Sequence, residues 1–268
     1  MEIRAGYDIS IQFPAPTPLI LMLDIRPERE PDLITPQRPV FEPWVPVQRY
    51  IDGFGNRCTR LLAPAGIFRT WAEFTVYDNG RPERHVLDAQ QIPVEDLPSD
   101  VLVFLLGSRY CETDLLSEFA WSVFGGTPPG WARVQAIVDY VHNHLTFSYA
   151  NARNTRTAWE GWNERIGVCR DFAHLAVTLC RCMNIPARYC TGYLGDIGVP
   201  LVPDPMDFSA WFEVWLDGTW YTFDARHNKP RIGRIVIARG RDAADVAIST
   251  SFGPHLLTSF NVTTHEIV

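Results

Sequence analysis

The sequence lacks a long apolar segment and an excess of basic residues. Its best apolar run near the N-terminus is Leu19–Leu23, five residues, whereas a transmembrane helix needs about 20. The first residues also lack a basic stretch followed by an apolar core, so we expect no signal peptide and a cytoplasmic protein. Lys and Arg number 24 against 31 Asp and Glu, which gives a net charge of −7. This balance disfavours nucleic acid as a partner, and we expect no membrane partner either.

Patterns typical of metal sites and disulfide frameworks are missing as well. The chain has six cysteines, but none belongs to a C-x-x-C pair, and no Cys or His spacing is typical of zinc sites. Cys180 and Cys182 lie two residues apart on a predicted helix, where their side chains point in different directions. We therefore expect free thiols, no metal and no cofactor.

The first part of the chain, residues 1–110, has the pattern of many short β-strands separated by Pro and Gly turns. Alternation of apolar and polar residues predicts a strand over Ile3–Phe13, and the turn residues 52–56 predict a hairpin. This pattern favours an N-terminal β-sandwich-like domain over 1–110. The expected strands are Ile3–Phe13, Leu19–Ile25, Val47–Ile51, Arg57–Leu62 and Phe68–Tyr77.

From residue 111 the pattern changes to helices followed by strands, which predicts an α+β core domain over 111–240. The last predicted helix, Cys169–Met183, is apolar nearly all round and should be buried. A C-terminal extension over 241–268 is expected to pack on the rest through a strand. The expected helices are Thr113–Phe124, Pro129–Tyr149, Thr157–Ile166 and Cys169–Met183, and the expected strands are Ala187–Leu194, Phe208–Leu216, Thr219–Asp224, Ile232–Ala238 and Leu256–Thr263.

Cys169 stands at the start of the buried helix, two residues after Gly167. Backbone N–H groups in the first turn of a helix have no partner within the helix, and the helix dipole is positive there. Both effects favour thiolate over thiol, and the thiolate is the nucleophile. Cys169 is therefore a candidate nucleophile, and its own N–H is a candidate oxyanion donor.

Two segments, GVCRDFAHLAVTLCRCMNIPARYCTGYL (167–194) and DFSAWFEVWLDGTWYTFDARHN (207–228), resemble the core of the bacterial transglutaminase-like superfamily. The resemblance implies a papain-like cysteine protease fold, with helices packed on an antiparallel sheet behind an N-terminal β domain. It also implies that Cys169 is the nucleophile, that Asp224 is the orienting acid and that a histidine on the first hairpin strand is the base. This sequence has Ser209 at the position of that histidine.

The hairpin register places the expected acid near the missing base. A two-residue turn at 217–218 sets a register in which Ser209 faces Arg226 and Trp211 faces Asp224. Side chains alternate along a strand, so all four share one face. A serine hydroxyl does not take a proton from a thiol at neutral pH. Either another residue is the base, or catalysis is impaired.

His227 is the main candidate for a substitute base. It lies three residues after Asp224 and would point to the opposite face of a continuing strand, unless a turn at 225–228 redirects it. The alternative interpretation is an ordinary loop histidine. The other histidines near the site are better interpreted as packing or helix-end residues, namely His142, His144 and His174.

Asn163 and three further residues complete the set of candidates. Asn163 precedes the nucleophile by six residues, the offset at which papain-like enzymes carry an oxyanion-hole amide, and is a weak oxyanion candidate. The candidates for a substrate groove are Trp162, Trp211 and Arg226. For the two tryptophans, buried packing is the alternative interpretation.

The sequence leans towards an enzyme. The first hypothesis is a cysteine protease or amide hydrolase, in which Cys169 forms a thioester with a peptide or carboxamide substrate. The alternative is a catalytically impaired relative that binds peptides or acts as a scaffold, because Ser209 replaces the histidine. A third and weaker hypothesis is redox sensing by Cys169. The substrate, the choice between hydrolysis and transamidation, a lid role for the loop at 195–207 and the oligomeric state stay open.

Overall fold

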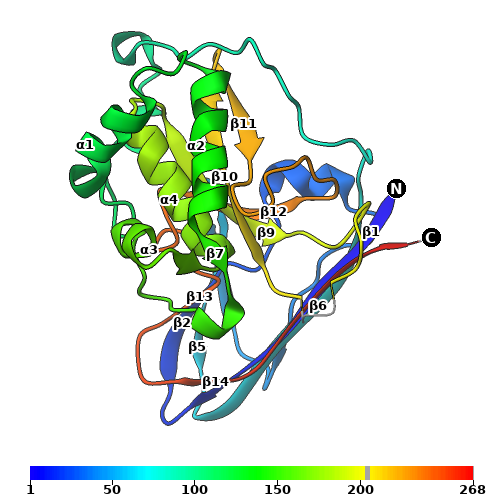
Figure 1. Cartoon of the computed structure of the whole chain (residues 1–268). Coiled ribbons are helices and arrows are strands. Elements are labelled where there is room, and N and C mark those ends of the chain that lie inside the picture. Colours follow the sequence, from blue (N-terminus) through cyan, green and yellow to red (C-terminus); the bar gives the residue numbers. More distant parts are fainter. Residues whose placement is uncertain (203–205, 268) are drawn as a thin grey trace.

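The computed structural model describes residues 1–202 and 206–267, and its helices pack against one face of a four-stranded antiparallel sheet (Figure 1). The sheet order is β11-β10-β9-β12. This arrangement confirms the predicted α+β core. The elements are α1 (Thr113–Phe124), α2 (Trp131–His144), α3 (Ala158–Glu164), α4 (Cys169–Cys182), β9 (Ala187–Tyr193), β10 (Ser209–Leu216), β11 (Thr219–Phe223) and β12 (Ile235–Gly240).

Helix α4 is the centre of this core. It lies between the sheet and the other helices, and Leu175, Val177 and Leu179 are fully buried. A helix with apolar residues on nearly all sides is buried because each of its faces packs against an apolar neighbour. The start of α4, and with it Cys169, is thereby fixed relative to β10.

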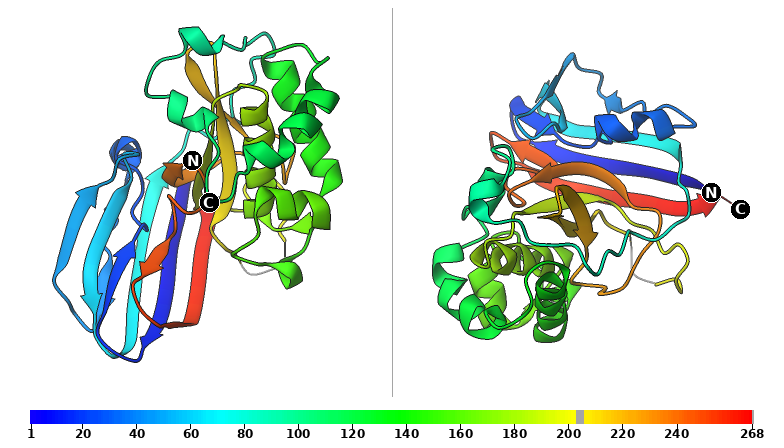
Figure 2. Two further views of the ribbon diagram at one scale, coloured as in Figure 1. Left: turned by 90° about the vertical axis from the view of Figure 1, so that its left-hand side faces the viewer. Right: turned by 90° about the horizontal axis from the view of Figure 1, so that it is seen from above.

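The N-terminal part forms two further four-stranded sheets, β14-β1-β6-β3 and β13-β2-β5-β4. The last strand, β14, pairs with the first, β1, along nearly its full length, as Figure 2 shows. Segment 241–268 thus adds one strand to each sheet. The strands are β1 (Glu2–Phe13), β2 (Thr17–Leu21), β3 (Val40–Glu42), β4 (Val47–Ile51), β5 (Arg57–Ala63), β6 (Gly66–Tyr77), β13 (Ser249–Ser251) and β14 (Leu256–Ile267).

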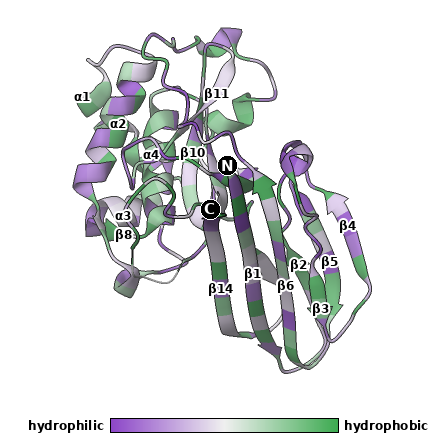
Figure 3. Ribbon diagram, turned by 90° about the vertical axis from the view of Figure 1, so that its right-hand side faces the viewer, coloured by the Kyte–Doolittle hydropathy of each residue, from purple (hydrophilic) through white to green (hydrophobic). Residues whose placement is uncertain are grey.

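The β-sheets of the N-terminal part and the sheet of the helical core share one apolar cluster. Ile3 and Phe74 of the former belong to the same buried cluster as Tyr193 and Ile235 of the latter. Figure 3 shows polar and apolar residues in alternating bands along β1 and β6, which is the period of a strand with one buried face. The two parts therefore stabilise each other.

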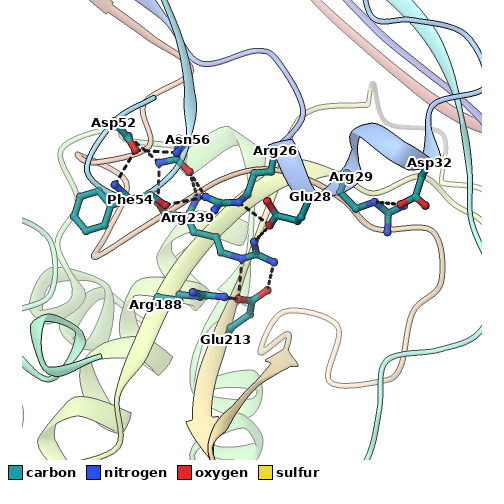
Figure 4. A network of polar contacts seen from close by, with 10 residues as sticks. All are labelled: Arg26, Glu28, Arg29, Asp32, Asp52, Phe54, Asn56, Arg188, Glu213 and Arg239. Atoms are coloured by element: carbon teal, nitrogen blue, oxygen red, sulfur yellow. Dashed lines mark hydrogen bonds and ion pairs between the residues drawn. The ribbon is translucent and has the colours of Figure 1, made fainter. Parts of the chain in front are cut away.

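A buried ion cluster joins the same two parts (Figure 4). Glu213 of β10 is 5 % exposed and pairs with Arg188 of β9 and Arg239 of β12. Arg239 also pairs with Glu28, from the segment between β2 and β3. The cluster fixes the N-terminal segment on the face of the sheet opposite the helices.

Several elements differ from the sequence prediction. The second helix ends at His144 rather than Tyr149, because Leu145 is extended and the next two residues pair with a segment before α4. Strand β2 stops at Leu21. Strands β3 and β13 were not predicted. The remaining short elements are β7 (Thr146–Phe147), β8 (Ile166–Gly167) and the 3-10 helices η1 (Pro27–Asp32), η2 (Val94–Asp96), η3 (Leu102–Leu105) and η4 (Tyr149–Asn151).

No helix in the described residues is long and apolar enough to cross a membrane. The cytoplasmic location and the domain boundaries at 110 and 240 stay predictions. Part of the predicted loop at 195–207 lies outside the described residues.

Candidate active site

The start of α4 is built around the carboxylate of Asp171. Its Oδ2 accepts the backbone N–H of Val168 at 2.9 Å and Nη1 of Arg156 at 3.0 Å. A Cβ at Gly167 would lie 2.6 Å from Cβ of Asp171, so only glycine leaves room for this carboxylate. The backbone N–H of Cys169 has no acceptor among the described residues and is free to bind an oxyanion.

Cys169 differs from the other five cysteines in exposure, because it is partly accessible and they are buried. Burial raises the pKa of the Cys169 thiol to about 11. Arg226 opposes this increase, while Asp207 and Asp224 add to it. The direction is opposite to the lowered pKa that the position at a helix start led us to expect. The thiol keeps its proton near neutral pH until a base removes it.

The hairpin that follows α4 and β9 has the predicted register, but only as far as the pair Phe212–Phe223. Asp217 and Gly218 have positive φ angles of 47° and 75°, as a tight hairpin turn requires. Beyond Phe223 the chain leaves the sheet and turns at 225–227. The predicted facing pairs of Ser209 and Trp211 are therefore not strand pairs.

This turn brings His227 back onto Asp224. Nδ1 of His227 lies 2.8 Å from Oδ2 of Asp224, and Oδ1 of the same carboxylate accepts the backbone N–H groups of Arg226 and His227 at 3.0 Å each. Burial alone would raise the pKa of Asp224, but Arg234 and His227 outweigh it and hold the pKa far below its usual value. Asp224 is therefore an anion at neutral pH.

Because a carboxylate only accepts hydrogen bonds, Nδ1 of His227 carries the proton in this pair. The other ring nitrogen, Nε2, has no hydrogen-bond partner among the described residues. A neutral imidazole in this tautomer presents a lone pair at Nε2, which is the group that a base needs.

Helix α2 supports the turn from behind. Nδ1 of His142 lies 3.1 Å from the carbonyl oxygen of Ala225 and 3.0 Å from that of Arg226. Asn228 donates to Asp139 at 2.8 Å and accepts from Gln135 at 3.0 Å. The position of His227 is thus fixed by three residues on one helix.

A cavity of about 380 Å³ lies beside the turn. His227 and Arg226 line it, and so does Ser209, whose Oγ is buried without a hydrogen-bond partner among the described residues. The remaining wall includes Tyr149 and Asp207. The charges of Arg226 and Asp207 also act on the Cys169 thiol, so this thiol lies within electrostatic range of the wall.

The other candidate residues are not brought to the cavity. Asn163 is exposed on α3, and its amide donates to the carbonyl oxygen of Trp159. Trp162 donates to the hydroxyl of Tyr140 at 2.9 Å and packs among helix aromatics. Trp211 is 2 % exposed and lies under the guanidinium of Arg234. Trp211 is thus packed in the interior and Trp162 is partly buried against the helices, and neither lines the cavity.

The three remaining histidines of interest have structural partners. His142 supports the turn described above, and Nε2 of His144 lies 2.7 Å from the carbonyl oxygen of Trp162. His174 is fully buried and accepts the backbone N–H of Ala243 at 3.1 Å. Burial lowers the pKa of His174 well below its usual value, so it is neutral.

Arg234, Glu83 and Arg156 also belong to the site, although no motif in the sequence points to them. Arg234 donates to Asp224 at 2.7 Å and pairs with Glu83. Glu83 lies about 140 positions before Asp224 in the chain, so no local pattern points to it. A buried arginine near an acid has no sequence signature. In the described residues, no group of three or more His, Cys, Asp or Glu side chains could hold a metal ion.

The comparisons with known proteins concern this same region. A family model for the transglutaminase-like superfamily matches residues 118–225. The crystal structure of a cysteine protease candidate from Cytophaga hutchinsonii is 32 % identical, covers 99 % of this chain and 90 % of that chain, and superposes with a TM-score of 0.84.

Two mycobacterial proteins without a described function are also similar. One from Mycobacterium leprae is 36 % identical over 84 residues, 30 % of each chain. One from Mycobacterium tuberculosis is 28 % identical over 143 residues, 50 % of this chain and 46 % of the other. The chain thus spans less than half the length of these curated relatives.

Proposed function

The chain belongs to the transglutaminase-like superfamily, and we propose that it is a cysteine amide hydrolase in which His227 replaces the missing base. The observation that carries the proposal is the hydrogen bond of 2.8 Å between His227 and Asp224, beside the cavity that His227 lines. The proposed substrate is a peptide or a carboxamide.

The proposed reaction has two halves. In the first, Nε2 of His227 takes the thiol proton while Sγ of Cys169 attacks the carbonyl carbon, which forms a tetrahedral oxyanion near the Cys169 N–H. The C–N bond then breaks, and His227 returns the proton to the leaving amine. In the second half, water with the help of His227 attacks the thioester, and Cys169 leaves as the thiol with a carboxylic acid as product.

The raised pKa of Cys169 fits this order of events. A thiol with a pKa of about 11 is almost fully protonated at pH 7, so proton removal must accompany the attack. An anionic Asp224 stabilises the imidazolium that forms, because the two groups already share a hydrogen bond. Ser209 takes no proton in this scheme.

The experiment is hydrolysis of a set of peptide p-nitroanilides by the wild type, Cys169→Ala and Ser209→His. We expect release of p-nitroaniline by the wild type, its loss in Cys169→Ala, and no gain in Ser209→His, because the base is already present. A silent wild type together with an active Ser209→His variant would instead support a peptide-binding relative without turnover.

A further inference from the structure

Asp224 has two hydrogen-bond donors on one oxygen atom. Oδ2 accepts Nδ1 of His227 at 2.8 Å and Nη2 of Arg234 at 2.7 Å. The side chains of Asp224 and Arg234 are only 4 % and 9 % exposed. In such a buried pair, solvent screens the charges weakly. The charge that His227 experiences therefore depends on Arg234 as well as on Asp224.

Arg234 is itself balanced by an acid from outside the hairpin. Glu83 pairs with Nε of Arg234 and also accepts the backbone N–H of Arg231 at 2.6 Å. The indole of Trp211 lies 4.9 Å from the Arg234 guanidinium on another side. Asp224 and Arg234 alone sum to zero charge, and Glu83 brings the sum to minus one.

The segment that carries Glu83 connects β6 to the helices and is held in place. Trp131 at the start of α2 donates its backbone N–H to the carbonyl oxygen of Ala89 at 2.9 Å. Gly130 makes this close approach possible, since a Cβ there would lie 2.3 Å from the same oxygen and its φ is +90°. Glu83 therefore reaches Arg234 from an anchored segment.

We propose that Glu83 and Arg234 are positioning residues that set the charge of Asp224 and, through it, the proton affinity of His227. Arg234 keeps Asp224 ionised, and its positive charge offsets part of the negative potential that Asp224 exerts on the imidazole. Glu83 balances the charge of Arg234 and so restores the negative potential at the imidazole. The consequence for catalysis rests on the proposed function, whereas the effect on the His227 imidazole does not.

Other charged and titratable groups also surround His227. Lys229 and Arg226 are its neighbours in the turn, and both line the cavity with it. His142 and Asp139 of α2 contact the turn through its backbone and through Asn228. The cavity wall adds Tyr149, Asp196, Asp207 and Arg231, and a second cavity beside Asp224 adds His85. The charges of Arg226 and Asp207 also act on Cys169.

The test is the NMR titration of the His227 ring in protein labelled with ¹⁵N-histidine, with the signal assigned by loss in His227→Gln. Glu83→Gln should lower the titration midpoint by roughly 0.5 to 1 pH unit, because Arg234 is no longer balanced. Arg234→Met should raise it by a similar amount. Arg234→Lys, which keeps the charge, should leave it near the wild-type value.

Glu28→Gln is the matched control. Glu28 also comes from the N-terminal part and pairs with an arginine, Arg239 of β12. The Glu28→Gln substitution changes the net charge by the same amount as Glu83→Gln. Its midpoint should equal that of the wild type. Equal midpoints in Glu83→Gln and Glu28→Gln would overturn the proposal.

Arg234→Met leaves Asp224 without its cation, and a folding defect in that variant is a possible outcome. Glu83→Gln and Arg234→Lys then decide the question, because the first must move the midpoint and the second must not. The titration needs no substrate. If the protein hydrolyses no amide but the midpoints move as stated, the proposed function fails and this inference stands.

Discussion

Nδ1 of His227 and Oδ2 of Asp224 lie 2.8 Å apart, although a continuing strand would point the two side chains to opposite faces. The turn at 225–227 removes that conflict by leaving the sheet directly after Phe223. An acid–imidazole pair therefore forms within four consecutive residues. In this arrangement His227 comes from the turn after the second hairpin strand, β11, whereas Ser209 stands at the start of the first hairpin strand, β10.

The His227–Asp224 pair leads to a first prediction about turnover. His227→Gln should lower kcat by about 10² to 10⁴, the range that positioned general bases contribute. His265→Gln, an exposed change on β14, should leave kcat unchanged. Initial rates of p-nitroanilide hydrolysis measure both. Equal rates for the two variants would remove His227 from the mechanism.

The pKa of Cys169 leads to a second prediction, on alkylation. Because the reactive thiolate is a minor species below a pKa of about 11, the rate of reaction with iodoacetamide should rise about tenfold per pH unit between pH 7 and pH 10. Mass spectrometry of the peptide that contains Cys169 follows the rate. Cys169 should still react before the five buried cysteines. A rate that is already constant from pH 6 to pH 8 would contradict a protonated resting thiol.

The raised pKa of Cys169 also makes the free energy of unfolding depend on pH. The folded pKa of Cys169 is raised from its usual value of 9.0, so folding favours the protonated thiol. This contribution is complete below pH 9 and is lost as the pH rises towards 11. Urea unfolding at pH 8 and pH 10.5 should give a smaller loss of unfolding free energy for Cys169→Ala than for the wild type. An identical loss in both would argue against the raised pKa.

The ion cluster around Glu213 leads to a prediction about folding. Glu213→Gln leaves Arg188 and Arg239 without their shared carboxylate and should lower the free energy of unfolding by about 3 kcal/mol. Glu28→Gln, whose side chain is 45 % exposed, should cost less than about 1 kcal/mol. Urea denaturation monitored by tryptophan fluorescence compares the two. Equal stabilities would contradict a structural role for the cluster.

The stabilisation that the ion pairs of Glu213 provide should decrease in acid. Burial would raise the pKa of Glu213, but Arg239 and Arg188 outweigh it and lower the pKa below its usual value. The ion pairs therefore stabilise the protein above the unfolded pKa and lose this effect as the pH falls through the folded one. The difference in stability between the wild type and Glu213→Gln should shrink accordingly in acid.

Much of the fold follows from local patterns in the sequence. The first helix, Thr113–Phe124, has the predicted bounds, and the central helix differs by one residue, because period and turn residues define such elements directly. The second helix is shorter than predicted because its last residues pair with a segment near α4. Such long-range pairing leaves no local signal.

The helix start at Cys169 and the strand end before Asp224 could be predicted from the sequence, but the surroundings of the two residues could not. Cys169 begins α4 and Asp224 directly follows β11, and the resemblance to the transglutaminase-like superfamily pointed to both residues. The placement of His227 depends on where the hairpin stops pairing, which three residues of α2 help to fix. Glu83 and Arg234 meet only in three dimensions, so no spacing in the sequence announces them.

Intact-mass spectrometry of the protein after rapid mixing with an excess of a peptide p-nitrophenyl ester shows whether Cys169 carries an acyl group during turnover. We expect a mass increase equal to the acyl group on the wild type, its removal by neutral hydroxylamine, and its absence in Cys169→Ala. His227→Gln should accumulate the adduct more slowly. Turnover of the ester with no adduct, or an adduct that persists in Cys169→Ala, would mean that Cys169 is not the nucleophile.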